Sequence, residues 1–91
     1  MKDEVIRDLT IQELYKDERT RDIVLPYLRV LMKYRLIESE ADCLNFGHLG
    51  FSIGEIDFDM CANMGGGMPI EGWREMIEAL RSFEYGEYNA K

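Results

Sequence analysis

Two long stretches of the chain place apolar residues at three- and four-residue steps, the spacing of one face of an α-helix. In the first stretch the apolar positions are Val24, Leu28 and Leu31. Pro26 fits a helix best in its first turn, where a backbone N–H has no helical partner. We therefore expect a central core helix over residues 22–37, with Thr20 or Asp22 as its N-terminal cap.

The second stretch follows three consecutive glycines, and Pro69 stands where a first helical residue is expected. Its apolar positions are Ile70, Trp73, Ile77 and Leu80. This pattern predicts an amphipathic helix over residues 69–84. We read residues 65–67 as an internal glycine connector and residues 85–91 as a frayed tail.

Helix starts are also marked by capping chemistry. Thr10 is followed three residues later by Glu13, the spacing of a capping box, and the flanking Leu9 and Leu14 form the pattern of a hydrophobic staple. A helix is therefore expected from about residue 10 to residue 17. The sequence leaves open whether residues 2–8 extend that helix or form a separate turn.

Two further caps lie in the middle of the chain. Ser39 with Asp42 predicts a short helix that stops at Gly47, and Ser52 with Glu55 predicts another that ends at the glycines. Residues 56–60 also alternate between apolar and acidic, as a half-buried strand does. Helix is the favoured reading, and a minor β-hairpin over residues 49–60 is the alternative.

Together these patterns predict a mainly α fold, a small bundle of four to five short helices; with the hairpin, the class would be α+β. At 91 residues the chain has the length of a single domain, residues 1–91. The longest apolar run is interrupted by basic residues and is too short for a membrane span. The charged N-terminus does not lead into a signal-peptide core, so we expect a cytoplasmic protein that does not bind membranes.

Charge is distributed unevenly. Residues 1–37 hold eight Lys and Arg against seven Asp and Glu, whereas residues 38–91 hold three against eleven, so the formal net charge of −7 arises almost wholly from the second part. Between Arg35 and Arg74 there is no Lys or Arg. The seven carboxylates in that interval are Glu38, Glu40, Asp42, Glu55, Asp57, Asp59 and Glu71.

A cluster of unpaired carboxylates repels nucleic acid and favours basic protein surfaces. We therefore expect these seven residues to form an acidic face that binds a partner. Tyr85 and Tyr88 extend this predicted interface, because tyrosine is enriched at binding hot spots. The plainer interpretation is that acidity serves only to keep the protein soluble.

The segment 49–56 resembles the turn of a helix-turn-helix motif, with Gly50 in the turn and Ser52 capping the next helix. The resemblance implies a DNA-binding regulator. However, Phe46 stands where such motifs have a small residue, and the helix after the turn carries Glu55, Asp57 and Asp59 and no basic residue. A scaffold of this kind used for protein contact is the alternative. If the chain does bind DNA, it would have to use basic residues of the first third of the sequence: Arg19, Arg21, Arg29, Lys33 and Arg35.

Candidate catalytic and metal chemistry is sparse. Cys43, His48 and Cys61 lack the paired spacing of a zinc site, and the two cysteines, separated by eighteen positions, are expected to be buried thiols. The glycines before Pro69 lack the Gly-Lys-Ser/Thr sequence of a phosphate-binding loop. We therefore expect no enzymatic activity, no metal and no cofactor.

The leading hypothesis is a regulator or inhibitor that docks its acidic face on a basic protein, such as a nucleic-acid-handling enzyme or a defence complex. Small acidic inhibitors of phage type, which mimic nucleic acid, share this size and charge. The first alternative is a structural subunit that forms a homodimer through the apolar faces of its two long helices. The second is the divergent helix-turn-helix regulator.

Overall fold

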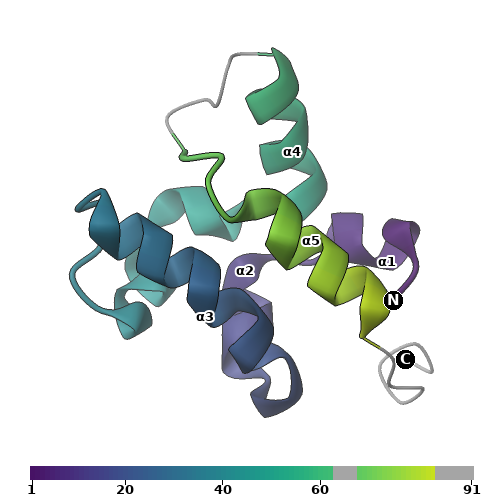
Figure 1. Ribbon diagram of the computed structural model, residues 1–91, viewed down its shortest axis with the longest axis horizontal. Helices are drawn as coiled ribbons and strands as arrows, with labels where there is room; N and C mark the ends of the chain where they lie inside the picture. The colour runs from purple at the N-terminus through teal and green to yellow at the C-terminus, as the bar shows by residue number, and fades with distance from the viewer. Residues whose placement is uncertain (63–67, 84–91) are drawn as a thin grey trace.

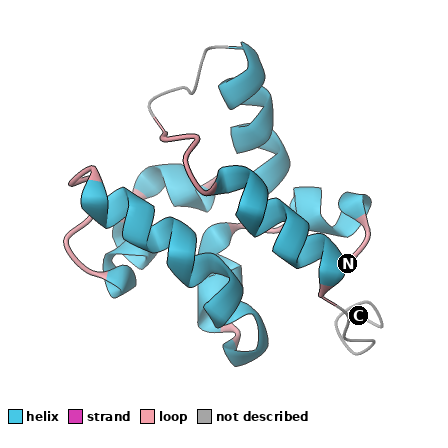
Figure 2. Cartoon of the chain, in the orientation of Figure 1, coloured by secondary structure: helices cyan, strands magenta, loops and turns pink. Residues whose placement is uncertain are grey.

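The computed structural model describes residues 1–62 and 68–83, and within these residues it contains helices and loops but no strand (Figures 1 and 2). The predicted mainly α fold is confirmed. The described helices are α1 (Asp3–Asp8), α2 (Ile11–Lys16), α3 (Glu18–Lys33), the 3₁₀ helices η1 (Glu40–Asn45) and η2 (Gly47–Gly50), α4 (Ile53–Ala62) and α5 (Trp73–Ser82). The predicted connector 65–67 and tail 85–91 lie outside the described residues.

The caps predicted at Thr10 and Ser52 form as expected. In α2 the Thr10 hydroxyl accepts from the Glu13 N–H, and the Glu13 carboxylate accepts from the Thr10 N–H, both at 3.0 Å. Residues 3–8 form the separate helix α1, because Leu9 takes an extended conformation between the two helices. In α4 the same exchange joins Ser52 and Glu55. The hairpin alternative over residues 49–60 is therefore wrong.

Helix α3 begins four residues before the predicted start. Asp17 caps it by accepting from the Arg19 N–H at 2.9 Å, so neither Thr20 nor Asp22 is the cap. Pro26 consequently lies inside the helix. Its missing N–H leaves the Asp22 carbonyl without a helical donor, and both residues are exposed, so this carbonyl lies on the solvent side of α3.

The predicted end of this helix at residue 37 is also wrong. Arg35 adopts a left-handed conformation with φ of 62°, and the Leu36 N–H donates back to the Leu31 carbonyl at 2.9 Å. The Arg35 N–H donates to the Met32 carbonyl at 3.0 Å, which completes a Schellman motif. Helix α3 therefore ends at Lys33 by an arrangement that usually employs glycine.

The last helix begins at Trp73 rather than at Pro69. Gly72, with φ of 80°, caps it in a left-handed conformation, and the Pro69 carbonyl accepts from the Tyr27 hydroxyl at 2.8 Å. A Cβ atom at Gly72 would lie 3.2 Å from Val30 of α3. Packing against α3 thus holds residues 69–72 in a turn that the local sequence does not reveal.

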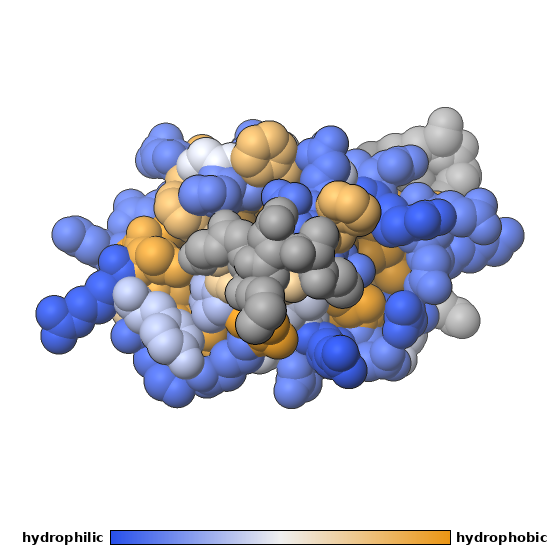
Figure 3. All heavy atoms as spheres, turned by 90° about the horizontal axis from the view of Figure 1, so that it is seen from above, coloured by the Kyte–Doolittle hydropathy of each residue, from blue (hydrophilic) through white to orange (hydrophobic). Residues whose placement is uncertain are grey.

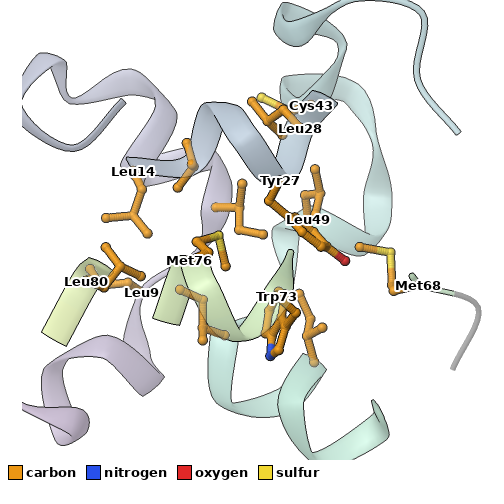
Figure 4. Close-up of a cluster of buried hydrophobic side chains, with 14 of the residues drawn as sticks. Leu9, Leu14, Tyr27, Leu28, Cys43, Leu49, Met68, Trp73, Met76 and Leu80 are labelled. Atoms are coloured by element: carbon orange, nitrogen blue, oxygen red, sulfur yellow. The ribbon is translucent and has the colours of Figure 1, made fainter. Parts of the chain in front are cut away.

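One core joins all of these helices. Figure 4 shows side chains from α2, α3, η1, η2 and α5 meeting at its centre, where the rings of Tyr27 and Trp73 pack edge to face with centroids 5.2 Å apart. The buried Thr20 hydroxyl donates to the Leu14 carbonyl at 2.8 Å and so fixes the junction between α2 and α3. The ammonium group of Met1 donates to the Leu80 and Arg81 carbonyls, which places the N-terminus at the end of α5 (Figure 1).

Candidate functional site

The seven predicted carboxylates do not behave as one set, and two of them are neutralised by cations of α3. Glu40 pairs with Arg29 at 3.2 Å. Glu71 pairs with Lys33 at 3.0 Å and also accepts from the Tyr34 hydroxyl at 2.8 Å. The hydrogen bond from Lys33, followed by that from Tyr34, lowers the pKa of the Glu71 carboxyl. Neither carboxylate is therefore an uncompensated charge.

Three more carboxylates have structural partners. Asp42 accepts from the backbone N–H groups of Glu38 and Ser39, both at 3.0 Å, at the start of η1. Glu55 accepts from the Ser52 N–H at the start of α4. Asp57 accepts from the indole N–H of Trp73 at 3.0 Å and thereby joins α4 to α5. These hydrogen bonds leave the three carboxylates negatively charged, but they fix the orientation of each carboxylate group.

Glu38 and Asp59 are exposed and form no ion pair within the described part of the chain. They lie on different elements, because Glu38 precedes η1 whereas Asp59 belongs to α4, which projects at the top of Figure 1. The structure thus places these two residues on separate elements, while Glu55 and Asp59 both lie on α4. Tyr85 and Tyr88 lie outside the described residues.

A groove between α1 and α4 brings two of the seven, Glu55 and Asp59, together with charged residues of α1. The two helices are brought together where the Ile53 N–H donates to the Leu9 carbonyl at 2.7 Å and where Thr10 forms an isolated antiparallel bridge with Ser52. Gly54 permits the close approach, because a Cβ atom there would lie 3.1 Å from Cβ of Arg7. The groove has a volume of about 660 Å³.

Two exposed aromatic rings line this groove, here called the α1–α4 groove. Phe51 leaves 54% of its surface exposed and Phe58 leaves 70%. The remaining lining side chains are mostly charged or polar, and the described lining residues are Glu4, Arg7, Asp8, Phe51, Ser52, Gly54, Glu55, Phe58 and Asp59. Seen from the end where α4 stands, apolar surface emerges within hydrophilic surroundings (Figure 3).

The groove has an acidic character that its own cation does not cancel. Four carboxylates and one guanidinium line it, a formal net charge of −3. Glu4, Asp8 and Asp59 form no ion pair with any cation that the structure describes, and Arg7 forms none with a described carboxylate. Charge of this kind remains available to an incoming partner.

A second groove, which shares Arg7 and Gly54 with the first, is of similar volume but has most of its charges satisfied. It is lined from α1, α4 and α5 and has a volume of about 650 Å³. Arg81 pairs with Asp3 at 2.8 Å and with Glu78 at 2.6 Å, and Asp57 is bonded to Trp73. The α1–α4 groove is therefore the better candidate for a binding site.

The residues considered for metal or nucleophilic chemistry do not form a site within the described part of the chain. Cys43 is a buried free thiol, and burial, followed by the charge of Asp42, raises its pKa to about 11. A protonated thiol is neither a good metal ligand nor a good nucleophile. The described side chains include no group of three His, Cys, Asp or Glu residues placed to hold a metal ion. The side chain of Cys61 lies outside the description.

The helix-turn-helix resemblance does not extend to the three-dimensional structure. Gly50 and Ser52 do precede the helix α4. The segment before the turn, however, consists of the short 3₁₀ helices η1 and η2 rather than an α-helix. The first helix of such a motif is therefore missing from this part of the chain.

Sequence reasoning missed Glu4, Asp8, Phe51 and Phe58 as members of a site. Helix α1 belongs to the nearly neutral first part of the chain, so the charge distribution along the sequence does not single out its carboxylates. Phe58 carried a usable signal, since a large apolar residue between Asp57 and Asp59 is unexpected on a solvated helix face. The contact of α1 with α4 could not be read from spacing, because more than forty residues separate the two helices.

Comparison with protein-family models, curated proteins and solved structures finds no match to this chain. No helix in the described part of the chain is both long and apolar enough to cross a membrane.

Proposed function

We propose that this protein is a binding module that docks the α1–α4 groove on a basic segment of another protein. The observation that carries the proposal is the pair of exposed rings, Phe51 and Phe58, in a groove with a net charge of −3. Exposed apolar surface rimmed by polar groups is typical of protein contact sites. The partner it fits carries positive charge beside apolar atoms.

The aromatic rings would supply the affinity of such a contact. Removing Phe58 and Phe51 from water on binding is favourable, and aromatic residues are enriched at the centres of interfaces. Helix α4 presents Phe58 outward because Ile53, Ile56 and Met60 occupy its buried face. The ring is thus held on a rigid element, so little freedom is lost when a partner covers it.

The carboxylates would supply the association rate and the choice of partner. Glu4, Asp8 and Asp59 repel nucleic acid and attract cationic protein surfaces. An enzyme that handles nucleic acid offers such a surface, and occupying it would exclude the nucleic acid. The regulatory or inhibitory role expected from the charge of the chain is therefore retained in this proposal, with a smaller acidic set that keeps Glu55 and Asp59 and adds Glu4 and Asp8.

The two alternatives have less support. The apolar faces of α3 and α5 pack against each other within one chain, with Val24, Leu28 and Leu80 at 0% exposure, so these faces are not available to a second copy. DNA binding through the first third of the chain would need free cations. Arg29 and Lys33 are instead paired with carboxylates, and Arg21 donates to the Tyr15 carbonyl.

The proposal is tested with a labelled peptide that interleaves arginine, lysine and leucine, titrated with the protein while fluorescence anisotropy is recorded. We expect saturable binding that weakens as salt is raised, because exposed charges are screened beyond about 8 Å at physiological ionic strength. The variant Asp8→Lys/Asp59→Lys should lose about tenfold or more in affinity. Both residues are exposed, and neither is in an ion pair with a described residue.

The matched control is Glu38→Lys/Glu75→Lys, which changes the net charge by the same amount at exposed positions outside the groove. This control should bind nearly as well as the unaltered protein. Equal loss in both double variants would show that only the overall charge matters and would refute the groove as the site. Absence of binding to the basic peptide at low salt would refute the proposal as a whole.

A further inference from the structure

We infer that the α1–α4 groove selects arginine over lysine, with a partner guanidinium stacked on Phe58 and bonded to the adjoining carboxylates. The inference deepens the proposed function and rests on it. It names the side chain that the groove recognises, whereas net charge alone would treat the two basic residues alike.

The position of Phe58 among carboxylates carries the inference. Asp59 follows it in sequence, and Glu55 lies three residues before it, one turn away on the helix surface. Asp59 and Glu55 line the same groove as the ring. A purely aliphatic group placed on this ring would remove water from the nearby carboxylates without giving them hydrogen bonds, which is unfavourable. The ring therefore suits a partner group that is both flat and positively charged.

A guanidinium meets both requirements at once. Its plane stacks on an aromatic face, and its donors form two parallel hydrogen bonds with a carboxylate. An ammonium is compact and strongly hydrated, so it remains in water beside a carboxylate and gains less from the ring. The two exposed rings, Phe51 and Phe58, offer two such stacking surfaces in one groove.

Arg7, the one cation among the described residues that line the groove, does not itself stack on the phenylalanine rings. Arg7 lines the groove, but its Cβ and Cγ atoms lie against Gly54, at 3.1 and 3.2 Å from the position of an added Cβ. The described residues show no stacking of Arg7 on either phenylalanine, whereas Arg21 does stack on Tyr15, at 5.2 Å from the ring centroid. Four carboxylates against one guanidinium leave room for further cations.

Two peptides of equal length and charge separate arginine recognition from general basicity. One repeats arginine and leucine, and the other replaces every arginine by lysine. Titrated at the same ionic strength, the arginine peptide should bind about tenfold more tightly, given the strength of cation–π contacts that exclude water. Equal affinities for the two peptides would overturn the inference and leave the proposed function standing. Absence of binding to either would overturn both.

The variant Phe58→Leu keeps an apolar side chain but removes the ring. We expect it to weaken the arginine peptide severalfold and to change the lysine peptide little, so that the preference shrinks. Tyr34→Leu is the control, since Tyr34 is an exposed ring 51% accessible outside the groove. An arginine preference that survives Phe58→Leu/Phe51→Leu undiminished would overturn the inference. Circular dichroism confirms that each variant remains helical.

Discussion

At the scale of single residues, a nearby donor in space decides whether a carboxylate is hydrogen-bonded within the protein or remains available to a partner. Asp57 and Asp59 are both exposed and lie two positions apart on α4. Asp57 nevertheless accepts from the indole of Trp73 at 3.0 Å, whereas Asp59 faces the α1–α4 groove. Helical geometry separates them by about 200° around the axis, so one joins two helices and the other remains available.

This difference predicts opposite outcomes for one substitution at two neighbouring sites. Asp57→Ala leaves the Trp73 N–H without its acceptor and should lower the free energy of unfolding by about 1–3 kcal/mol. Asp59→Ala should change it by less than about 0.5 kcal/mol. Urea unfolding followed by tryptophan fluorescence measures both. Similar small effects for the two variants would show that the bond to Trp73 contributes nothing.

At the scale of elements, helix starts were predicted well where the capping residues lie within one turn of each other. Thr10 with Glu13 and Ser52 with Glu55 form the predicted exchanges. Local bonds at Asp17 and Arg35, which the apolar spacing does not reveal, set the start and end of α3. The predicted start of α5 was wrong because distant contacts decide it. Tyr27 binds the carbonyl of Pro69, and Gly72 lies against Val30, so residues before Trp73 form a turn.

The backbone at the end of α3 is strained at Arg35. Arg35 occupies a left-handed conformation that costs a non-glycine residue about 1–2 kcal/mol. Arg35→Gly should therefore raise the free energy of unfolding by about 0.5–1 kcal/mol, since glycine adopts this conformation freely but loses more entropy on folding. The measurement is the midpoint of urea unfolding. The control Arg35→Ala keeps the strain and should show no such gain; a gain of equal size would assign the effect to the lost charge.

At the scale of the whole molecule, the α1–α4 groove exists only because the first helix folds against the fourth. Gly54 lies at that contact, and an added Cβ would lie 3.3 Å from the Arg7 carbonyl, a backbone atom that cannot move aside alone. The exposed faces of the two helices then share a single surface, to which α1 contributes Glu4 and Asp8.

Gly54→Val should accordingly separate the two helices. We expect a loss of about 1–3 kcal/mol in the free energy of unfolding, the usual cost of overpacking, together with weaker binding of the basic peptide. Gly47→Val is the matched control, because nothing lies within 4 Å of a Cβ atom at Gly47. The check is thermal unfolding by circular dichroism. An equal loss at both positions would refute close packing as the cause.

The sequence by itself determined the helical class, the caps at Thr10 and Ser52, and the excess of negative charge, because each depends on neighbours a few residues apart or on composition alone. Only the tertiary structure decided which carboxylates remain unpaired. Glu71 meets Lys33 across 38 positions and Glu40 meets Arg29 across 11. Such pairs form when helices pack, and no local pattern records them. The same packing brought α1 against α4 and left Phe58 exposed beside acidic side chains, which is the surface that we propose binds a partner.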